Sequence, residues 1–225
     1  MSPEIIIFGT GEVSDIVSVY FESFSNYKII AYTIDGQFIK NQTFRKKPIV
    51  PFEEIHKVYS PKNHGMFIAL GYHNLNKLRK DKYIQSKKKG YKLVSFIHPK
   101  SNILNTTKFG DNSLILDNQS IQPFASIGSN CFIWSGVLIA HHVTIGDHCW
   151  ITSEASVAGH SNIGESSFIG INATIGHMVN IGNQCFIGAN TLITKHADDK
   201  SVFIQKDTDL FRLNSDQFIK FSKMR

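Results

Sequence analysis

The sequence predicts two architectures in one chain: a small α/β domain, followed by an all-β solenoid with a short helical tail. Strand-like and helix-like patterns alternate over the first hundred residues. From Ile103 to Ile193, every sixth residue is then aliphatic or phenylalanine, without insertion or deletion. The next position is often glycine, as at Gly128 and Gly146, which suits a tight turn. We therefore expect an α/β domain at 1–98, a solenoid at 99–200 and a tail at 201–225.

The first domain should contain a small, Rossmann-like parallel sheet. Apolar, strand-like runs occupy residues 5–9, 28–34, 47–50, 66–72 and 93–97. Helical patterns occupy residues 13–21, 51–55 and the segment from after Asn74 to about residue 89, where Gly90 follows as a C-cap. Because strands and helices alternate, the strands should lie parallel.

A repeat of six residues excludes both an amphipathic helix, which has about 3.6 residues per turn, and an isolated strand. It fits stacked coils in which each repeat is one short strand and turn that buries one large side chain. Cys131, Cys149 and Cys185 occupy one position of this repeat, 18 and 36 residues apart. That spacing indicates three repeats per coil, and it makes the cysteines small buried side chains rather than metal ligands. In the tail, residues 201–206 are strand-like and residues 215–223 are helical, and we expect this helix to cap the solenoid.

The net charge of +6 raises the question of an anionic partner. Basic residues are densest at 77–92, but no nucleic-acid-binding motif accompanies them, so we interpret this segment as a solvated helix face and expect no nucleic acid partner. Apolar runs reach only about five residues, too short to span a membrane. No signal peptide is visible at the start of the chain, which favours a cytoplasmic protein with no membrane partner.

The hexads, together with four features of the first domain, resemble a known family. These features are Gly9-Thr10-Gly11, Asp35, Gly71 and the segment Ile97-His98-Pro99. The chain resembles the left-handed parallel β-helix (hexapeptide-repeat) acyltransferases, in particular the sugar acyltransferases of the sialic-acid O-acetyltransferase type. The segment 71–79 is similar to their amino-sugar N-acetyltransferase branch.

This resemblance implies a left-handed β-helix and an acetyl-CoA-dependent transfer to the amine of a nucleotide-linked amino-deoxy sugar. A 4-amino-4,6-dideoxy sugar used in surface glycan (lipopolysaccharide O-antigen) synthesis is the implied acceptor class. It also implies a homotrimer with sites between neighbouring β-helices, and no metal cofactor. Two alternatives stay open: O-acetylation of a sugar hydroxyl, and a non-catalytic trimeric β-helix that only binds ligands.

The same resemblance assigns catalytic residues. The general base maps onto His141, because an imidazole with a pKa near about 6.5 can take a proton from an attacking amine. His142 follows it, where many relatives have a carboxylate, so orientation of His141 should come from Glu154, Asp147 or a backbone carbonyl. Gly159, one coil later, should offer its N–H to the thioester carbonyl. The implied acyl-CoA contacts are Gly159, Gly188 and Ala189.

The nucleotide-sugar site is expected in the first domain. Its candidate residues are Gly9, Gly11, Asp35, Gly71, Asn76 and Arg79. An NAD site is the weaker interpretation, because the third glycine of the dinucleotide motif is Ser14. A zinc hydratase would use His141 and His177, 36 residues apart, but Gly182 stands where its third ligand is needed.

Overall fold

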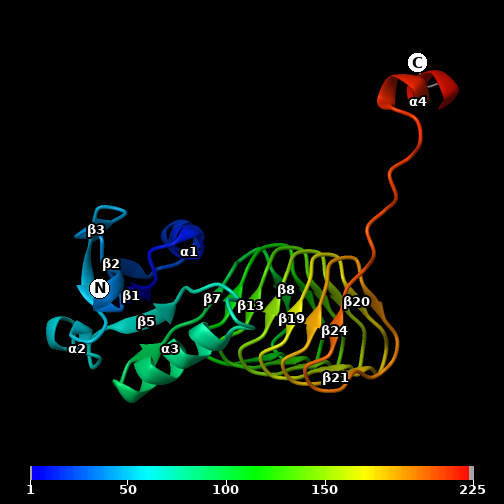
Figure 1. Cartoon of the computed structure of the whole chain (residues 1–225). Helices are drawn as coiled ribbons and strands as arrows, with labels where there is room; N and C mark the ends of the chain where they lie inside the picture. The colour runs from blue at the N-terminus through cyan, green and yellow to red at the C-terminus, as the bar shows by residue number, and fades with distance from the viewer. Residues whose placement is uncertain (1, 223–225) are drawn as a thin grey trace.

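The computed structural model describes residues 2–222, which form an N-terminal α/β domain, a β-helix and an extended tail. In Figure 1 the N-terminal domain lies against one end of the β-helix, and the tail leaves from the opposite end. The predicted fold class is therefore confirmed. None of the helices within 2–222 is long and apolar enough to cross a membrane.

The N-terminal sheet has the strand order β3-β4-β2-β1-β5-β6 and is parallel except between β3 and β4. Its strands are β1 (Glu4–Phe8), β2 (Lys28–Ile34), β3 (Thr43–Phe44), β4 (Lys47–Pro51), β5 (Gly65–Ile68) and β6 (Lys92–Leu93). The helices are α1 (Glu12–Phe24), the 3-10 helix η1 (Gly36–Phe38), α2 (Ile55–Val58) and α3 (Lys77–Lys88). The central strand β1 is buried on both faces, since Ile5, Ile6 and Ile7 have no exposed surface.

Several element boundaries in the first domain differ from the sequence prediction, and the helix predicted at 51–55 is α2, at Ile55–Val58. The strand predicted at 66–72 ends at Ile68, and α3 begins only at Lys77. Asn74, Leu75 and Asn76 all have positive φ angles, of 50°, 47° and 65°, and a helix cannot run through left-handed residues. The residue types Asn-Leu-Asn do not predict three consecutive residues with a left-handed backbone.

The β-helix consists of three parallel sheets, and each coil contributes one short strand to each sheet. Sheet 1 contains β7 (Phe96–Ile97), β10 (Leu114–Ile115), β13 (Phe132–Ile133), β16 (Trp150–Ile151), β19 (Phe168–Ile169), β22 (Phe186–Ile187) and β24 (Val202–Phe203). Sheet 2 contains β8 (Asn102–Ile103), β11 (Ser120–Ile121), β14 (Leu138–Ile139), β17 (Ser156–Val157), β20 (Thr174–Ile175) and β23 (Leu192–Ile193). Sheet 3 contains β9 (Lys108–Phe109), β12 (Ser126–Ile127), β15 (Thr144–Ile145), β18 (Asn162–Ile163) and β21 (Asn180–Ile181).

The interior of the β-helix matches the prediction. The repeated large residues point inward, and Cys131, Cys149 and Cys185 lie among them with no exposed surface. The first strand of the β-helix is β7, which pairs with β10, so the β-helix begins at Phe96 and not at residue 99. The strand predicted at 93–97 is therefore two strands in two sheets, because Ile97 already follows the six-residue register of Ile103.

Two-residue turns join the sheets at three corners of each coil. The His corner joins sheets 2 and 3 and contains the turns 123–124, 141–142, 159–160 and 177–178. The docking corner joins sheets 3 and 1 through the turns 111–112, 129–130, 147–148, 165–166 and 183–184. The third corner joins sheets 1 and 2 through the turns 135–136, 153–154, 171–172 and 189–190.

The N-terminal domain packs against the outer face of sheet 1. The outward residue of this sheet is large and apolar in every coil that the domain covers: Phe96, Leu114, Phe132, Trp150 and Phe168. Phe67 of β5 stacks on Phe132, with ring centroids 5.7 Å apart, and Phe132 stacks on Trp150 at 5.1 Å. Sheet 2 presents polar residues such as Ser120 and Ser156 interspersed with the exposed Leu138 and Leu192, so it lacks the continuous apolar face of sheet 1.

Helix α3 fixes the domain to the docking corner, and this corrects the prediction for Arg79 and Asn76. Arg79 has no exposed surface and donates to the carbonyl oxygens of Asn130 (3.2 Å), His148 (3.0 Å) and Cys149 (3.1 Å). Burial lowers its pKa to about 10. Asn76 is equally buried, with its amide 3.3 Å from the carbonyl oxygen of Ser166. Both side chains join the two domains and are not accessible to a sugar or diphosphate.

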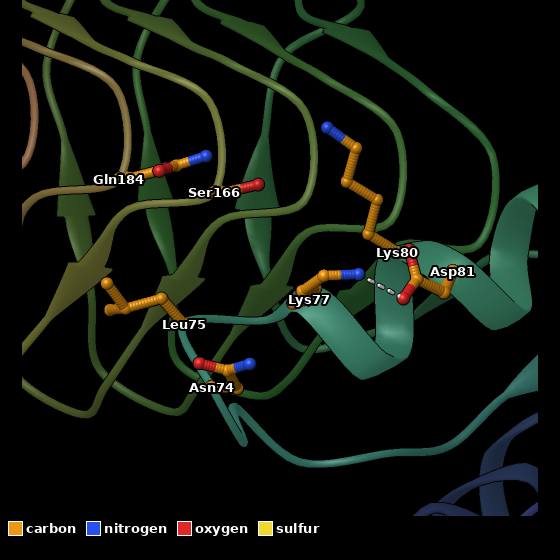
Figure 2. Close-up of a pocket in the computed structure, with 7 residues that line it drawn as sticks. All are labelled: Asn74, Leu75, Lys77, Lys80, Asp81, Ser166 and Gln184. Carbon is orange, nitrogen blue, oxygen red and sulfur yellow. Dashed lines mark hydrogen bonds and ion pairs between the residues drawn. The ribbon is translucent and has the colours of Figure 1, made fainter.

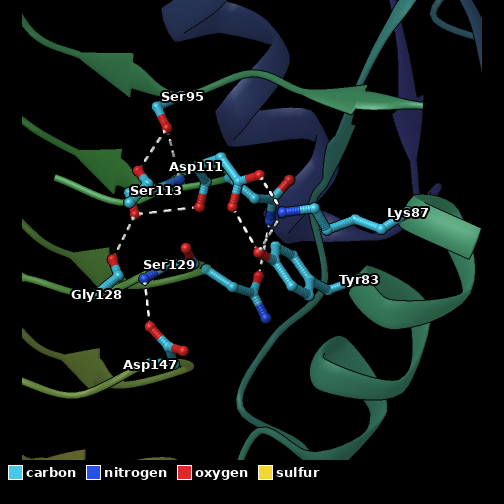
Figure 3. A network of polar contacts seen from close by, with 11 residues as sticks. Tyr83, Lys87, Ser95, Asp111, Ser113, Gly128, Ser129 and Asp147 are labelled. Atoms are coloured by element: carbon cyan, nitrogen blue, oxygen red, sulfur yellow. Dashed lines mark hydrogen bonds and ion pairs between the residues drawn. The ribbon is translucent and has the colours of Figure 1, made fainter. Parts of the chain in front are cut away.

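A second set of polar contacts lies at the other end of α3 (Figure 3). Lys87 forms an ion pair with Asp111 at 2.7 Å, and the hydroxyl of Tyr83 donates to the other oxygen of that carboxylate at 2.5 Å. The pKa of Asp111 lies below its usual value, because these two partners outweigh the effect of burial. The carboxylate of Asp147 accepts from the Ser129 N–H at 2.7 Å in the same corner.

The tail departs from its prediction. Strand β24 extends sheet 1 by pairing with β22, as part of the predicted strand 201–206. The helix predicted at 215–223 is α4 (Ser215–Ser222), with residue 223 outside the described residues, and no residue of α4 is buried. Figure 1 shows α4 at the end of an extended segment, away from the β-helix. The expectation that it caps the solenoid is wrong, and β24 covers the last coil instead.

Candidate active site

Four histidines gather at the His corner: His141, His142, His160 and His177. Each turn of this corner has its second residue in the left-handed region, with φ near 59° at both His142 and His160. Residues 18 apart therefore repeat the same backbone shape and stack along the β-helix. The sequence prediction singled out the first two histidines, and the structure adds His160 as their direct neighbour.

The ring of His141 lies directly over Gly159. A Cβ at residue 159 would be 2.8 Å from Cε1 and 2.9 Å from Nε2 of His141, so only glycine leaves room for the ring there. The backbone N–H of His141 donates to Oε1 of Gln122 at 3.0 Å. Within residues 2–222, the N–H of Gly159 has no hydrogen-bond acceptor. A basic nitrogen and a free backbone donor thus lie side by side.

His142 is the polar neighbour of the His141 ring. The two Nδ1 atoms are 3.1 Å apart, which requires one to carry a proton and the other to accept it. His142 also stacks on His160, with centroids 4.8 Å apart and planes at 10°. Slight desolvation, followed by the charges of the neighbouring imidazoles, lowers the pKa of His160.

Neither carboxylate that the sequence offered as a partner of His141 is near it. Asp147 belongs to the docking corner and binds the Ser129 N–H. Glu154 belongs to the third corner, where its carboxylate lies over Gly136. These expectations are wrong because the corners of one coil point in three directions. Gln122, which the sequence gave no reason to select, holds the backbone of His141 instead.

Gly188 and Ala189 also lie at the third corner, with Gly188 buried and Ala189 exposed. Sheet 2 separates them from the His corner of the same chain. One chain therefore does not bring these predicted acyl-CoA contacts to His141.

Apart from Asn76 and Arg79, the candidate nucleotide-sugar residues of the first domain lie near the carboxyl ends of its central parallel strands. Gly9 follows β1 with a φ of 126°, and a Cβ there would be 2.7 Å from the carbonyl oxygen of Ala69. Gly11 precedes α1, which has no side-chain cap, and a Cβ there would have no atom within 4 Å. Free N–H groups at such a helix start attract anions. Asp35 follows β2 and forms a 2.5 Å ion pair with Lys82, a contact the sequence did not predict.

A pocket of about 700 Å³ opens beside Gly71, between this sheet edge and the β-helix. Tyr72 and His73 line it from the loop after β5, Val13 lines it from α1, and Trp150 lines it from sheet 1. Tyr72 packs against Trp150 and Phe168, with centroids 5.4 and 4.7 Å apart. The pocket combines an apolar wall with exposed polar groups, as ligand sites do.

A smaller pocket of about 290 Å³ lies between the start of α3 and the docking corner (Figure 2). Its lysines are already paired: Lys77 with Asp81 at 2.6 Å, and Lys80 with Glu165. Lys82 and Lys87 are paired with carboxylates too, whereas Lys88, Lys89 and Lys92 form no ion pair among residues 2–222.

Known proteins share both the repeats and the fold. The family described as bacterial transferase hexapeptide (six repeats) matches residues 124–159 and 160–195. The acetyltransferase domain of PglB from Neisseria gonorrhoeae FA1090, in complex with acetyl coenzyme A, superposes with a TM-score of 0.81 at 18% identity, over 91% of this chain and 97% of that one. PerB from Caulobacter crescentus, in complex with CoA and GDP-perosamine, superposes with a TM-score of 0.80 at 21% identity, over 90% and 94%. No curated protein matches the sequence. At these identities the structural likeness establishes the fold.

Proposed function

We propose that this protein transfers the acetyl group of acetyl-CoA to the amine of a nucleotide-linked amino sugar, with His141 as the general base. The observation that carries the proposal is the His141 ring over Gly159, beside a backbone N–H that has no acceptor among residues 2–222. The proteins of the same fold add the ligand class: one binds acetyl coenzyme A, and another binds CoA with the nucleotide-linked amino sugar GDP-perosamine.

The chemistry follows from these groups. The amine nitrogen attacks the thioester carbonyl carbon, a C–N bond forms, and the carbonyl oxygen becomes an oxyanion that the Gly159 N–H stabilises. Nε2 of His141 takes the proton that the amine loses. The oxyanion then re-forms the carbonyl as the C–S bond breaks, and the leaving CoA sulfur takes the proton that His141 holds.

His142 acts as a positioning residue in this scheme. If Nδ1–H of His141 donates across the 3.1 Å contact to Nδ1 of His142, Nε2 of His141 keeps its lone pair for the amine. A neutral imidazole fixes this tautomer as a carboxylate would. It supplies no negative charge to stabilise the imidazolium that forms during the reaction.

The first domain would hold the nucleotide part of the acceptor through Gly9, Gly11, Asp35 and Gly71, next to the pocket of about 700 Å³. Gly188 and Ala189 contact acyl-CoA in this proposal only from a neighbouring chain, because sheet 2 lies between them and His141. A homotrimer with sites between its β-helices meets that requirement. We place the enzyme among the sialic-acid O-acetyltransferase type, in the cytoplasm, with a 4-amino-4,6-dideoxy sugar for surface glycans such as O-antigen as acceptor.

Release of the CoA thiol tests this proposal. Purified protein and acetyl-CoA are mixed with a panel of uridine-, thymidine- and guanosine-linked 4-amino-4,6-dideoxy and 3-amino sugars, and with matched sugars that carry a hydroxyl in place of the amine. We expect turnover with one amino sugar and none with its hydroxyl counterpart, and loss of turnover in His141→Ala. Turnover only with hydroxyl sugars would contradict N-acetylation. Full activity of His141→Ala would contradict the assigned base.

A further inference from the structure

We propose that the His corner is also a binding site for a divalent transition-metal ion such as Zn²⁺, held by His141, His142 and His160, and that metal binding there switches off the general base. The binding site follows from the geometry of the three histidines alone. The inhibition rests on the proposed function.

The three imidazoles already lie at nearly ligating separations. One ring nitrogen from each lies within 4.8 Å of the others, and all three side chains are exposed. The Nδ1 atoms of His141 and His142 are 3.1 Å apart, and the rings of His141 and His160 have centroids 5.0 Å apart. Nitrogens that each bind one zinc at about 2.0–2.1 Å lie roughly 3.3 Å from one another. The rings of His142 and His160 lie nearly parallel, with planes at 10°, so the exposed His160 side chain must rotate before its nitrogen can share one ion with the other two.

The backbone beneath these side chains is already fixed. The N–H of His160 donates to the carbonyl oxygen of His141 at 3.1 Å, which ties the two coils together. His142 and His160 occupy equivalent turn positions with the same φ of 59°, so their rings stack face to face. A metal ion would therefore find its ligands on a rigid scaffold, which reduces the entropic cost of binding.

The chemistry of the cluster selects the kind of metal. Three neutral imidazoles suit Zn²⁺, Ni²⁺ or Cu²⁺, whereas Mg²⁺ and Ca²⁺ require oxygen ligands. No carboxylate within residues 2–222 joins the group, so a fourth position would be open to water. This set differs from the His141 and His177 pair that the sequence spacing suggested, because the left-handed turn residues bring His142 and His160 together.

Metal binding and base catalysis exclude each other at His141. A neutral imidazole has one lone pair, on whichever nitrogen carries no proton. If the metal takes that lone pair, none remains for the amine. The same side chain therefore serves either the reaction or the metal.

Calorimetric titration of the untagged full chain with Zn²⁺, after treatment with EDTA and its removal, tests the site. We expect one ion per chain in the wild type and affinity weaker by more than about tenfold in His160→Ala, because a direct ligand is lost. His177→Ala is the matched control: its ring packs on His160 with centroids 5.7 Å apart but lies outside the group of three, so its affinity should be unchanged. Equal affinity in wild type and His160→Ala, or no binding at all, would overturn the site.

Acetyl transfer in the presence of the metal tests the inhibition. Each protein is compared with its own rate in EDTA, and Zn²⁺ should inhibit the wild type far more than His160→Ala. Equal inhibition of wild type and His160→Ala would show that the inhibitory ion does not bind through this cluster of histidines. Zinc binding that depends on His160, in a protein without acetyl transfer, would support the site and contradict only the proposed function.

Discussion

The contact between His141 and Gly159 makes Gly159→Ala the most informative substitution in the chain. The new Cβ would lie 2.8 Å from Cε1 of His141, whereas ordinary van der Waals contact begins at 3.4 Å, so the ring must move by roughly 0.6 Å or more. Gly159 is not among the glycines with positive φ, so alanine fits its backbone. A displacement of this size at a reacting group lowers rates by up to about 100-fold. We expect kcat/KM to fall about 10- to 100-fold, which corresponds to about 1.4–2.7 kcal/mol.

The assay compares steady-state thiol release by wild type, Gly159→Ala and Gly176→Ala. Gly176 provides a matched glycine in the same β-helix, where the nearest atom to a Cβ, apart from the chain neighbours, would be Ile193 O at 3.2 Å and not a histidine ring. Thermal unfolding checks that both variants fold. If Gly159→Ala folds normally and keeps the wild-type kcat/KM, then the position of the His141 ring over residue 159 does not matter for turnover, and the reasoning from this contact is refuted.

Three further predictions concern the rest of the structure. Arg79→Ala should lower the free energy of unfolding by about 3 kcal/mol or more, because three buried carbonyls lose their donor. Chemical denaturation measures this change, and an unchanged value would show that Arg79 does not stabilise the contact between the two domains. Burial lowers the pKa of His148 to about 4 from 6.5, so only the unfolded chain takes up this proton as the pH falls through that range. The contribution of neutral His148 to the free energy of unfolding should therefore be complete above pH 6.5 and decrease by about 3 kcal/mol towards pH 4. A folded His148→Gln variant should lose less stability over this pH range, because it lacks this contribution. His142→Ala should lower kcat about tenfold, whereas His142→Glu should retain activity because a carboxylate can hold the same His141 tautomer; equal losses in both would remove His142 from a positioning role.

The sequence predicted those parts of the fold that follow from a local pattern. The six-residue register fixed the inward positions of the β-helix, including all three cysteines, because each buried residue is determined by its own coil and the next. Five of the six strands of the first domain followed in place from their apolar runs, but β3 was not predicted. The turn at Asn74 to Asn76 did not, because the left-handed backbone there is imposed by contacts between α3 and the docking corner, far apart in the sequence.

The candidate site also has parts that the sequence predicted and parts that it did not. The spacing of 18 residues correctly placed Gly159 beneath His141. The roles of Asn76 and Arg79 could not be predicted, because a basic helix gives no sign of which residues a second domain will cover. The contact of His142 with His160 depends on the left-handed second residue of each turn, which a histidine does not signal.

The most direct test of the central claim is the mass of the acceptor after incubation with acetyl-CoA, measured for wild type, His141→Ala and the neighbouring control His177→Ala. We expect a nucleotide-linked amino sugar that gains the mass of one acetyl group with wild type and with His177→Ala, but not with His141→Ala. Acetylated acceptor formed equally fast by His141→Ala would contradict the claim that His141 is the general base.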